Sequence, residues 1–307
     1  MRLVVSGASG LLGLNLSLAA KKSGFDVTGL INNNHLKGVP FNVEKVDLLQ
    51  IKEAIQKIKQ IRPEGMIHCA AIADLNYAER HPELTQKLNG VVPGALAAAA
   101  AEWGIPFIHI STDAVFDGIV GNYRETDSTN PLSVYAKTKF EGEQAVLDVY
   151  QSAVVARVVF FGWSLTGRRS LSEFFVNNLQ AGNIVDGYTD TFFSPLYVED
   201  LAATLLKILN ENLSGIYHVV SPQSISKYEF GVRIAKEFGF DPLLIKPTQR
   251  KKIKNGVQRS LNLVLNPKKI QIALDKKMPT VDEGIKTMYQ RWIEGYPNSL
   301  QSYQVSQ

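Results

Sequence analysis

Short apolar runs rich in β-branched residues alternate along the chain with longer stretches in which apolar positions recur every three or four residues. The apolar runs predict strands at residues 2–6, 25–31, 42–48, 65–71, 106–112 and 153–160. The longer periodic stretches predict helices at residues 11–22, 50–60, 82–103 and 132–150. Alternating strands and helices indicate βαβ units, and strands that are apolar on both faces are typical of a parallel sheet covered by helices on each side.

The pattern becomes less regular after Gly162, where turn-rich segments separate the apolar stretches. Helices are expected there at residues 171–180, 198–209 and 227–238. We predict an α/β fold, a Rossmann-type doubly wound parallel sheet with a smaller C-terminal lobe. Residues 1–162 would form the dinucleotide-binding domain. Residues 163–307 would complete the sheet and form the substrate-binding lobe.

Composition narrows the class of protein. The 307 residues are 45% hydrophobic and carry a net charge of +4, which is ordinary for a globular protein and gives no reason to expect nucleic acid as a partner. The single cysteine, Cys69, excludes an internal disulfide, and the five histidines lack metal-ligand spacing. No signal peptide and no membrane-spanning run is visible, so a cytoplasmic location without membrane attachment is expected.

A glycine-rich loop, GASGLLG, joins the first predicted strand to the first predicted helix. Glycine permits the tight turn and the close approach of the backbone to a pyrophosphate, which the helix N-terminus then attracts. The loop therefore predicts a dinucleotide site at Gly7, Ser9, Gly10, Leu11, Leu12 and Gly13. Its G-x-x-G-x-x-G spacing resembles the extended, sugar-nucleotide branch of the short-chain dehydrogenase/reductase superfamily.

The end of the second strand, LINNNHLK, bears on the choice of cofactor. NAD-selective sites usually place an acidic residue here to bind the ribose 2′-hydroxyl, and none is present. Asn32 could bond a ribose hydroxyl, while His35 and Lys37 could contact a 2′-phosphate. NADP(H) is therefore favoured, and NAD(H) remains open.

The resemblance to the extended branch implies further cofactor contacts. Asp47 and Leu48 match an acidic and apolar pair that flanks the adenine in that branch. Ala70, Ala71 and Ile72 match the loop after the fourth strand, which lies along the cofactor.

Tyr135 and Lys139 stand four residues apart, so their side chains share one face of a predicted helix. A nearby ammonium favours the phenolate, which would lower the tyrosine pKa toward the range useful for general acid catalysis. The lysine could also hold the nicotinamide ribose. Thr112, at the end of the fifth strand, could polarise the substrate oxygen.

The segment from STDAVFDG to YAKTKFEGE resembles the dTDP-4-dehydrorhamnose reductase family. The residues that match the family pattern are Ser111, Thr112, Asp113, Val115, Phe116, Asp117, Gly118, Tyr123, Glu125, Pro131, Tyr135, Lys139, Gly142 and Glu143. Upstream, Asn89 matches an asparagine that supports a water-linked proton path, and downstream Arg157 also matches. The resemblance implies reduction of a nucleotide-linked 4-keto sugar and a homodimer as one oligomeric option. No metal site is visible in the sequence, so no metal is expected.

One position separates reduction from related reactions. Sugar-nucleotide dehydratases carry Thr-Asp-Glu where this chain has Thr112-Asp113-Ala114, and alanine cannot move a proton. The epimerase-reductases that use a pocket cysteine are disfavoured, because Cys69 lies inside a predicted strand. Hydride transfer to a ketone, with Tyr135 as the proton donor, is the reaction that remains.

The chain departs from the family on the substrate side, at residues 157–164 and 190–196. The candidate substrate-binding residues are Asp113, Trp163, Phe192, Phe193 and Arg259. Two alternatives stay open. The chain could bind NADP without turnover, like the regulatory subunit of methionine adenosyltransferase, which resembles the same family, or it could be a sugar-nucleotide epimerase.

Overall fold

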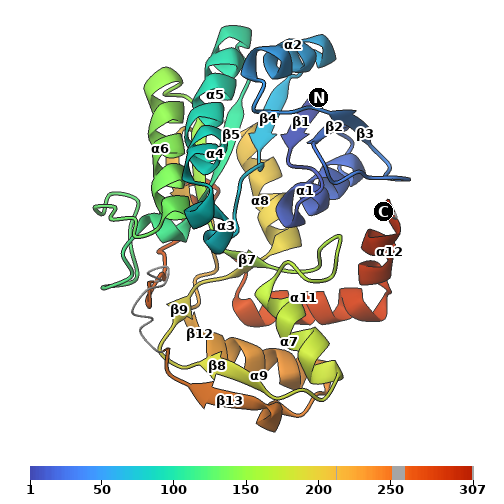
Figure 1. Ribbon diagram of the computed structural model, residues 1–307, viewed down its shortest axis with the longest axis vertical. Coiled ribbons are helices and arrows are strands. Elements are labelled where there is room, and N and C mark those ends of the chain that lie inside the picture. The colour runs from blue at the N-terminus through green and yellow to red at the C-terminus, as the bar shows by residue number, and fades with distance from the viewer. Residues whose placement is uncertain (212, 251–259, 306–307) are drawn as a thin grey trace.

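The computed structural model describes residues 1–211, 213–250 and 260–305. Within these residues the centre of the molecule is a seven-stranded parallel sheet in the order β11-β6-β5-β4-β1-β2-β3 (Figure 1). Its strands are β1 (Arg2–Ser6), β2 (Asp26–Ile31), β3 (Asn42–Lys45), β4 (Gly65–His68), β5 (Phe107–Thr112), β6 (Val154–Val158) and β11 (Gly215–His218). The chain runs outward from β1 first in one direction and then in the other, which is the doubly wound arrangement that the sequence predicted.

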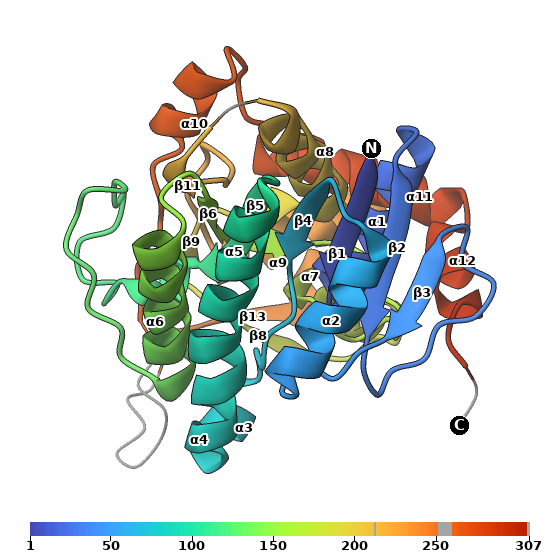
Figure 2. The same cartoon turned by 90° about the horizontal axis from the view of Figure 1, so that it is seen from above.

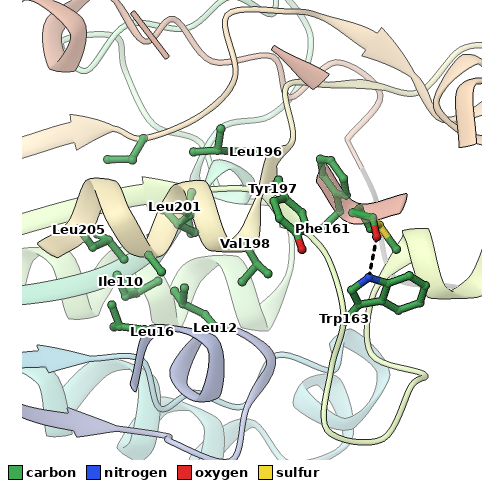
Figure 3. Packing of buried hydrophobic residues seen from close by; sticks show 14 of the residues in the cluster. Leu12, Leu16, Ile110, Phe161, Trp163, Leu196, Tyr197, Val198, Leu201 and Leu205 are labelled. Carbon is green, nitrogen blue, oxygen red and sulfur yellow. Dashed lines mark hydrogen bonds between the residues drawn. The ribbon is translucent and has the colours of Figure 1, made fainter. Parts of the chain in front are cut away.

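Helices cover both faces of the sheet, as Figure 2 shows from above. One face carries α2 (Ile51–Ile61), α5 (Val92–Trp103) and α6 (Val134–Val149), and the other carries α1 (Leu11–Lys22) and α8 (Val198–Asn210). Figure 3 shows Leu16 of α1, Leu201 of α8 and Ile110 of β5 packed together between the sheet and these two helices, where they belong to the largest core cluster. Burial of these apolar side chains fixes the helices on the sheet.

The helix predicted at 82–103 is interrupted. It consists of α4 (Pro82–Gln86), a π-helical turn (Lys87–Val91) and α5. Pro93 has no N–H to offer the carbonyl four residues earlier, so a regular α-helix cannot be continued through this point, and a wider turn accommodates the break. Asn89 lies inside that turn. A further short helix, α3 (Leu75–Arg80), precedes it and is capped by Asp74.

The predicted strand 153–160 is divided at Val159. β6 stays in the sheet, whereas β7 (Phe160–Phe161) leaves it and pairs with β10 (Leu196–Tyr197). The predicted strand 42–48 ends at Lys45. The chain therefore leaves the sheet within residues 157–164, a segment that departs from the family pattern.

The C-terminal part adds a lobe below the sheet edge in Figure 1. Two small sheets, β8–β13 and β9–β12, pack with several helices there. The strands are β8 (Val185–Tyr188), β9 (Phe192–Phe193), β12 (Ile225–Ser226) and β13 (Ile245–Thr248). The helices of the C-terminal part other than α8 are α7 (Leu171–Gln180), α9 (Lys227–Phe238), α10 (Lys268–Ala273), α11 (Val281–Ile293) and α12 (Tyr296–Ser302), and short 3₁₀ turns lie at Asp113–Val115 and Pro242–Leu244.

The second half contributes to both parts of the molecule. β11 forms one edge of the main sheet and α8 packs on α1, while the remaining elements build the lobe. The boundary at residue 162 stays a prediction. Of the helices in the described part of the chain, none has the length and apolar character needed to cross a membrane.

Candidate active site

The glycine loop is shaped by contacts of the backbone with itself. Gly7 has a φ of +69°, and a Cβ atom there would lie 2.8 Å from the backbone of Ala70. A Cβ atom on Gly13 would lie 2.1 Å from the carbonyl oxygen of Gly7. Because contacts this short do not occur, two of the three glycines are required by the packing of strand, loop and helix.

The same loop leaves a set of donors unpaired. α1 begins at Leu11 after the N-cap Gly10, whose position supplies no side-chain acceptor. The N–H groups of the first helical turn therefore have no capping partner and carry the positive end of the helix dipole. This arrangement fits the pyrophosphate of a dinucleotide, and Leu11, Leu12 and Gly13 are the residues whose amides would hold it.

The other predicted cofactor residues line the same edge of the sheet. Ser9 and His35 line one cavity together, while Asn32 and Asp47 line a second. Asp47 also accepts a hydrogen bond from the Leu49 amide at 3.0 Å. Two other candidates differ in exposure, since Leu48 is buried in the core and Lys37 is exposed.

Asn89 fixes the loop that follows β4. Its side-chain oxygen accepts from the Ile72 amide at 2.9 Å, and its side-chain nitrogen donates to the Ile72 carbonyl at 3.0 Å. The same nitrogen lies 3.4 Å from the Thr138 hydroxyl on α6. Asn89 is fully buried. In this structure it positions the Ala70–Ile72 loop, and its predicted part in a proton path remains a prediction.

Gly142 explains how α6 can approach this region. A Cβ atom at Gly142 would lie 2.2 Å from the carbonyl oxygen of Asn89. That carbonyl is the group to which Pro93, four residues later, has no N–H to donate. The π-helical turn and the glycine of α6 therefore fit one another, and together they set the distance between Asn89 and α6.

Thr112 and Tyr135 meet at the carboxyl edge of the sheet. Thr112 ends β5, and Tyr135 lies in the first turn of α6, which Ser133 caps through the Ala136 amide at 3.2 Å. The nearby Thr112 hydroxyl lowers the Tyr135 pKa and so opposes the effect of burial on the phenol. Burial is the larger effect and raises the Tyr135 pKa to about 12. The phenol is thus protonated at neutral pH.

Lys139 is directed at β5. Its ammonium donates to the Ile110 carbonyl at 2.6 Å and lies 3.2 Å from Nε2 of His109. Burial lowers the Lys139 pKa to about 8, against an opposing effect of Glu143. The expected lowering of the Tyr135 pKa by Lys139 is therefore wrong, because the Lys139 ammonium is bound to the Ile110 carbonyl of β5 and desolvation dominates at the phenol.

A buried ion pair anchors α6 to the sheet. Arg157 of β6 binds the carboxylate of Glu143 on α6 through two nitrogens, with a shortest distance of 2.7 Å. Ser111 of β5 donates to the same carboxylate. Both charged side chains are almost inaccessible. The sequence signal for this pair was an arginine within an otherwise apolar strand, and no role was assigned to it.

The residues predicted to bind substrate differ in whether a ligand could reach them. Trp163 is 3% exposed and donates from its indole nitrogen to the Met288 carbonyl (Figure 3), so its assignment to base stacking is wrong. Phe193 is also buried, against Phe230, and cannot stack on a ligand. Phe192 is 36% exposed and stays a candidate. Arg259 lies outside the described residues.

Asp113 follows Thr112 and is buried. It accepts a hydrogen bond from the Thr112 hydroxyl at 3.1 Å. Burial raises the Asp113 pKa to about 6, although Thr112 and Lys227 oppose this. The charge of Lys227, the first residue of α9, thus acts on a carboxyl at the end of β5, and the assignment of Asp113 to the substrate stays a prediction.

A doubly wound sheet with this glycine loop, and with a tyrosine and a lysine on the helix after β5, defines a nicotinamide-dependent oxidoreductase of the extended short-chain dehydrogenase/reductase class. Residues 1–293 match the family described as RmlD substrate binding domain. The chain belongs to this family, which includes the dTDP-4-dehydrorhamnose reductases.

Three relatives illustrate the range of the family. A probable low-salt glycan biosynthesis reductase, Agl14, of Haloferax volcanii is 30% identical over 92% of this chain and 96% of its own length. A dTDP-4-dehydrorhamnose reductase of Mycobacterium tuberculosis is 31% identical over 89% of this chain and 87% of its own. The methionine adenosyltransferase 2 subunit beta of Bos taurus is 31% identical, with coverages of 88% and 81%.

Solved structures share the fold. A dTDP-4-dehydrorhamnose reductase of Bacillus anthracis, in complex with NADP, superposes with a TM-score of 0.83 over 94% of this chain and 99% of its own, at 24% identity. Structures of this fold hold NADP in some cases and NAD in others.

Proposed function

We propose that this protein is an NADPH-dependent reductase of a nucleotide-linked 4-keto sugar. The observation that carries the proposal is the meeting of the Thr112 and Tyr135 hydroxyls at the carboxyl edge of the sheet, next to the strands that hold the glycine loop. Ligands of open α/β sheets bind at this edge. A ketone oxygen placed between the two hydroxyls would receive hydrogen bonds from both.

The chain's own residues would then handle one proton. When bound, NADPH supplies the hydride to the ketone carbon. Tyr135 donates its phenolic proton to the ketone oxygen, and its raised pKa keeps that proton in place at neutral pH. Thr112 would turn its hydroxyl proton from the Asp113 carboxylate to donate a second hydrogen bond to the same oxygen. Lys139 would turn from the Ile110 carbonyl toward the nicotinamide ribose and stabilise the phenolate that forms.

The surroundings of Thr112 favour reduction over loss of water. The amide of Ala114 donates to the Thr112 hydroxyl oxygen at 3.2 Å, and its side chain is a methyl group. Elimination needs a further acid or base at this place, which alanine cannot supply. Asp113 could offer a carboxyl, but it is engaged by Thr112 and lies near Lys227.

A panel of substrates tests the proposal. The purified chain is mixed with NADPH and with dTDP-, UDP- or GDP-linked 4-keto sugars, and the absorbance of the reduced nicotinamide is followed. Steady oxidation with at least one sugar is the expected result. Conversion of a sugar to its epimer without net oxidation of NADPH would replace the reductase proposal with an epimerase.

A second candidate function is NADP-dependent regulation of a partner enzyme. It is favoured by the 31% identity to a methionine adenosyltransferase 2 subunit beta over 88% of this chain. In that case NADPH binds tightly and no sugar of the panel is reduced. The presence of Thr112, Tyr135 and Lys139 together weighs against this function, because binding alone does not require a proton donor.

A further inference from the structure

A cavity of about 220 Å³ lies beside the glycine loop and is formed by segments far apart in the sequence. Ser9 and Leu11 come from the loop and the start of α1, and residues 33–35 from the turn after β2. The remaining wall comes from the C-terminal half of the chain. Its residues are Ser164, Leu165, Thr166, Arg169, Gln304 and Val305. The cofactor side of the molecule is thus completed by the half predicted to bind substrate.

The segment that carries Arg169 is held in place by one buried carboxylate. Glu173 of α7 accepts hydrogen bonds from the amide and hydroxyl of Ser164 and from the amides of Arg169 and Ser170, at 2.6 to 3.0 Å. Asn177 adds a bond to the Gly167 carbonyl at 2.8 Å. Because the backbone on both sides of Arg169 is fixed, its side chain starts from a defined point on the cavity wall.

The opposite wall is fixed as well. The Lys37 amide donates to the Tyr303 carbonyl at 2.9 Å, and Leu36 forms a β-bridge with Gln304. These bonds tie the turn after β2 to the segment that follows α12. The turn that bears His35 therefore has a preferred conformation although its side chains are exposed.

The charges in the cavity have one sign. Among the described residues that line the cavity none is acidic, and Arg169 and His35 are the basic ones. Within the described part of the chain the Arg169 guanidinium is exposed and has no hydrogen bond or ion pair. Its five donors suit the oxygens of a phosphate. A dianionic group in this cavity would thus find a cation without displacing an existing partner.

We propose that Arg169 selects NADP(H) over NAD(H) by binding the 2′-phosphate of the adenosine ribose in this cavity. In dinucleotide-binding sheets that ribose lies at the end of β2, where a nearby arginine accommodates a 2′-phosphate. The turn after β2 contains no arginine, and the fold supplies one from the β7–α7 loop instead. The inference rests on the proposed use of the glycine loop for a nicotinamide cofactor.

Adenosine phosphates test this inference without any sugar turnover. The full chain is titrated calorimetrically with 2′,5′-ADP and with 5′-ADP, which lacks the 2′-phosphate. The wild type is expected to bind 2′,5′-ADP more tightly. Arg169→Ala weakens 2′,5′-ADP by about 10- to 100-fold, the value of a charge-assisted bond, and leaves 5′-ADP unchanged. Arg169→Lys keeps part of the preference.

Arg168→Ala is the matched control, because Arg168 is an exposed neighbour of the same charge that does not line the cavity. It should bind both nucleotides as the wild type does. Equal affinity of the wild type for the two nucleotides, or an equal loss in both alanine variants, overturns the assignment. A protein that reduces no sugar of the panel but still prefers 2′,5′-ADP would disprove the proposed function alone. A protein that reduces a sugar of the panel but binds 2′,5′-ADP and 5′-ADP equally well would disprove the role of Arg169 alone.

Discussion

The cofactor side and the substrate side of the sheet edge are built in different ways. On the cofactor side, backbone touches backbone, as a Cβ atom on Gly13 would lie 2.1 Å from the Gly7 carbonyl oxygen. On the substrate side, β9 and β12 pair over two residues each, and Phe192 presents an exposed ring. The first side can change little without disrupting the fold, whereas the second can change its side chains while the fold persists.

Buried charge distinguishes the main sheet from the lobe. The Arg157–Glu143 pair between β6 and α6 is 2% and 1% exposed, whereas the Arg233–Asp282 pair in the lobe is 35% and 50% exposed. A buried pair is strongly destabilised when one partner is removed, and an exposed pair is not. The comparison therefore predicts where substitutions disrupt chemistry, where they disrupt folding and where they alter only specificity.

The largest effect is expected at the catalytic helix. Tyr135→Phe removes the proton donor, so kcat for reduction of the 4-keto sugar should fall by about 10²- to 10⁴-fold. The affinity for NADPH should stay the same, because the ring is retained. Stopped-flow absorbance of the reduced nicotinamide measures the first quantity, and fluorescence titration measures the second.

Tyr150→Phe serves as the control for that variant. Tyr150 lies at the opposite end of α6 and donates to the Ile105 carbonyl at 3.1 Å. Its loss removes one hydroxyl from the same helix and should leave kcat unchanged. Wild-type kcat in Tyr135→Phe would show that another group donates the proton.

The next largest effect concerns the two ion pairs. Glu143→Ala leaves the Arg157 guanidinium buried without its partner and should lower the free energy of unfolding by about 3–5 kcal/mol. Asp282→Ala exposes Arg233 further and should lower it by less than about 1 kcal/mol. Urea unfolding of both variants gives the two values. Similar losses in the two variants would show that the buried ion pair is no more important for stability than the exposed one.

A third effect depends on pH. The pKa of Asp113 is about 6 in the folded chain and 3.8 as its reference value, so the folded state binds this proton more tightly. Stability should therefore fall as pH rises from about 4 to 6, by up to about 3 kcal/mol. Asp113→Asn removes this loss and should be more stable than the wild type at pH 7, but not at pH 4. Parallel curves for the two proteins would exclude the buried carboxyl as the cause.

Much of the cofactor side could be predicted from the sequence, because its requirements are local. Strand, glycine loop and helix are adjacent in the chain, and Tyr135 and Lys139 lie one helical turn apart. The break at residues 87–91 depends on one residue, Pro93, and periodicity alone did not reveal it. Local patterns thus gave the elements correctly but missed the turn that orients Asn89.

Contacts between distant segments could not be predicted in this way. The aromatic ring of Trp163 suited stacking on a base as well as burial in the core. Only the packing of α11 shows that the indole is bound to the Met288 carbonyl. The direction of the Lys139 ammonium depends on His109, thirty residues away. The position of Arg169 beside Ser9 depends on the tertiary fold as a whole.

The smallest effect is expected on the substrate side. Phe192→Ala removes an exposed ring from β9 and should raise KM for the sugar nucleotide about tenfold, the value of one stacked base. The affinity for NADPH and the free energy of unfolding should stay close to those of the wild type. Phe174→Ala, which removes a comparably exposed ring from α7, should leave KM unchanged. An equal rise in KM in both variants would show that Phe192 does not contact the nucleotide, and the base would then have to be bound by other residues of the lobe.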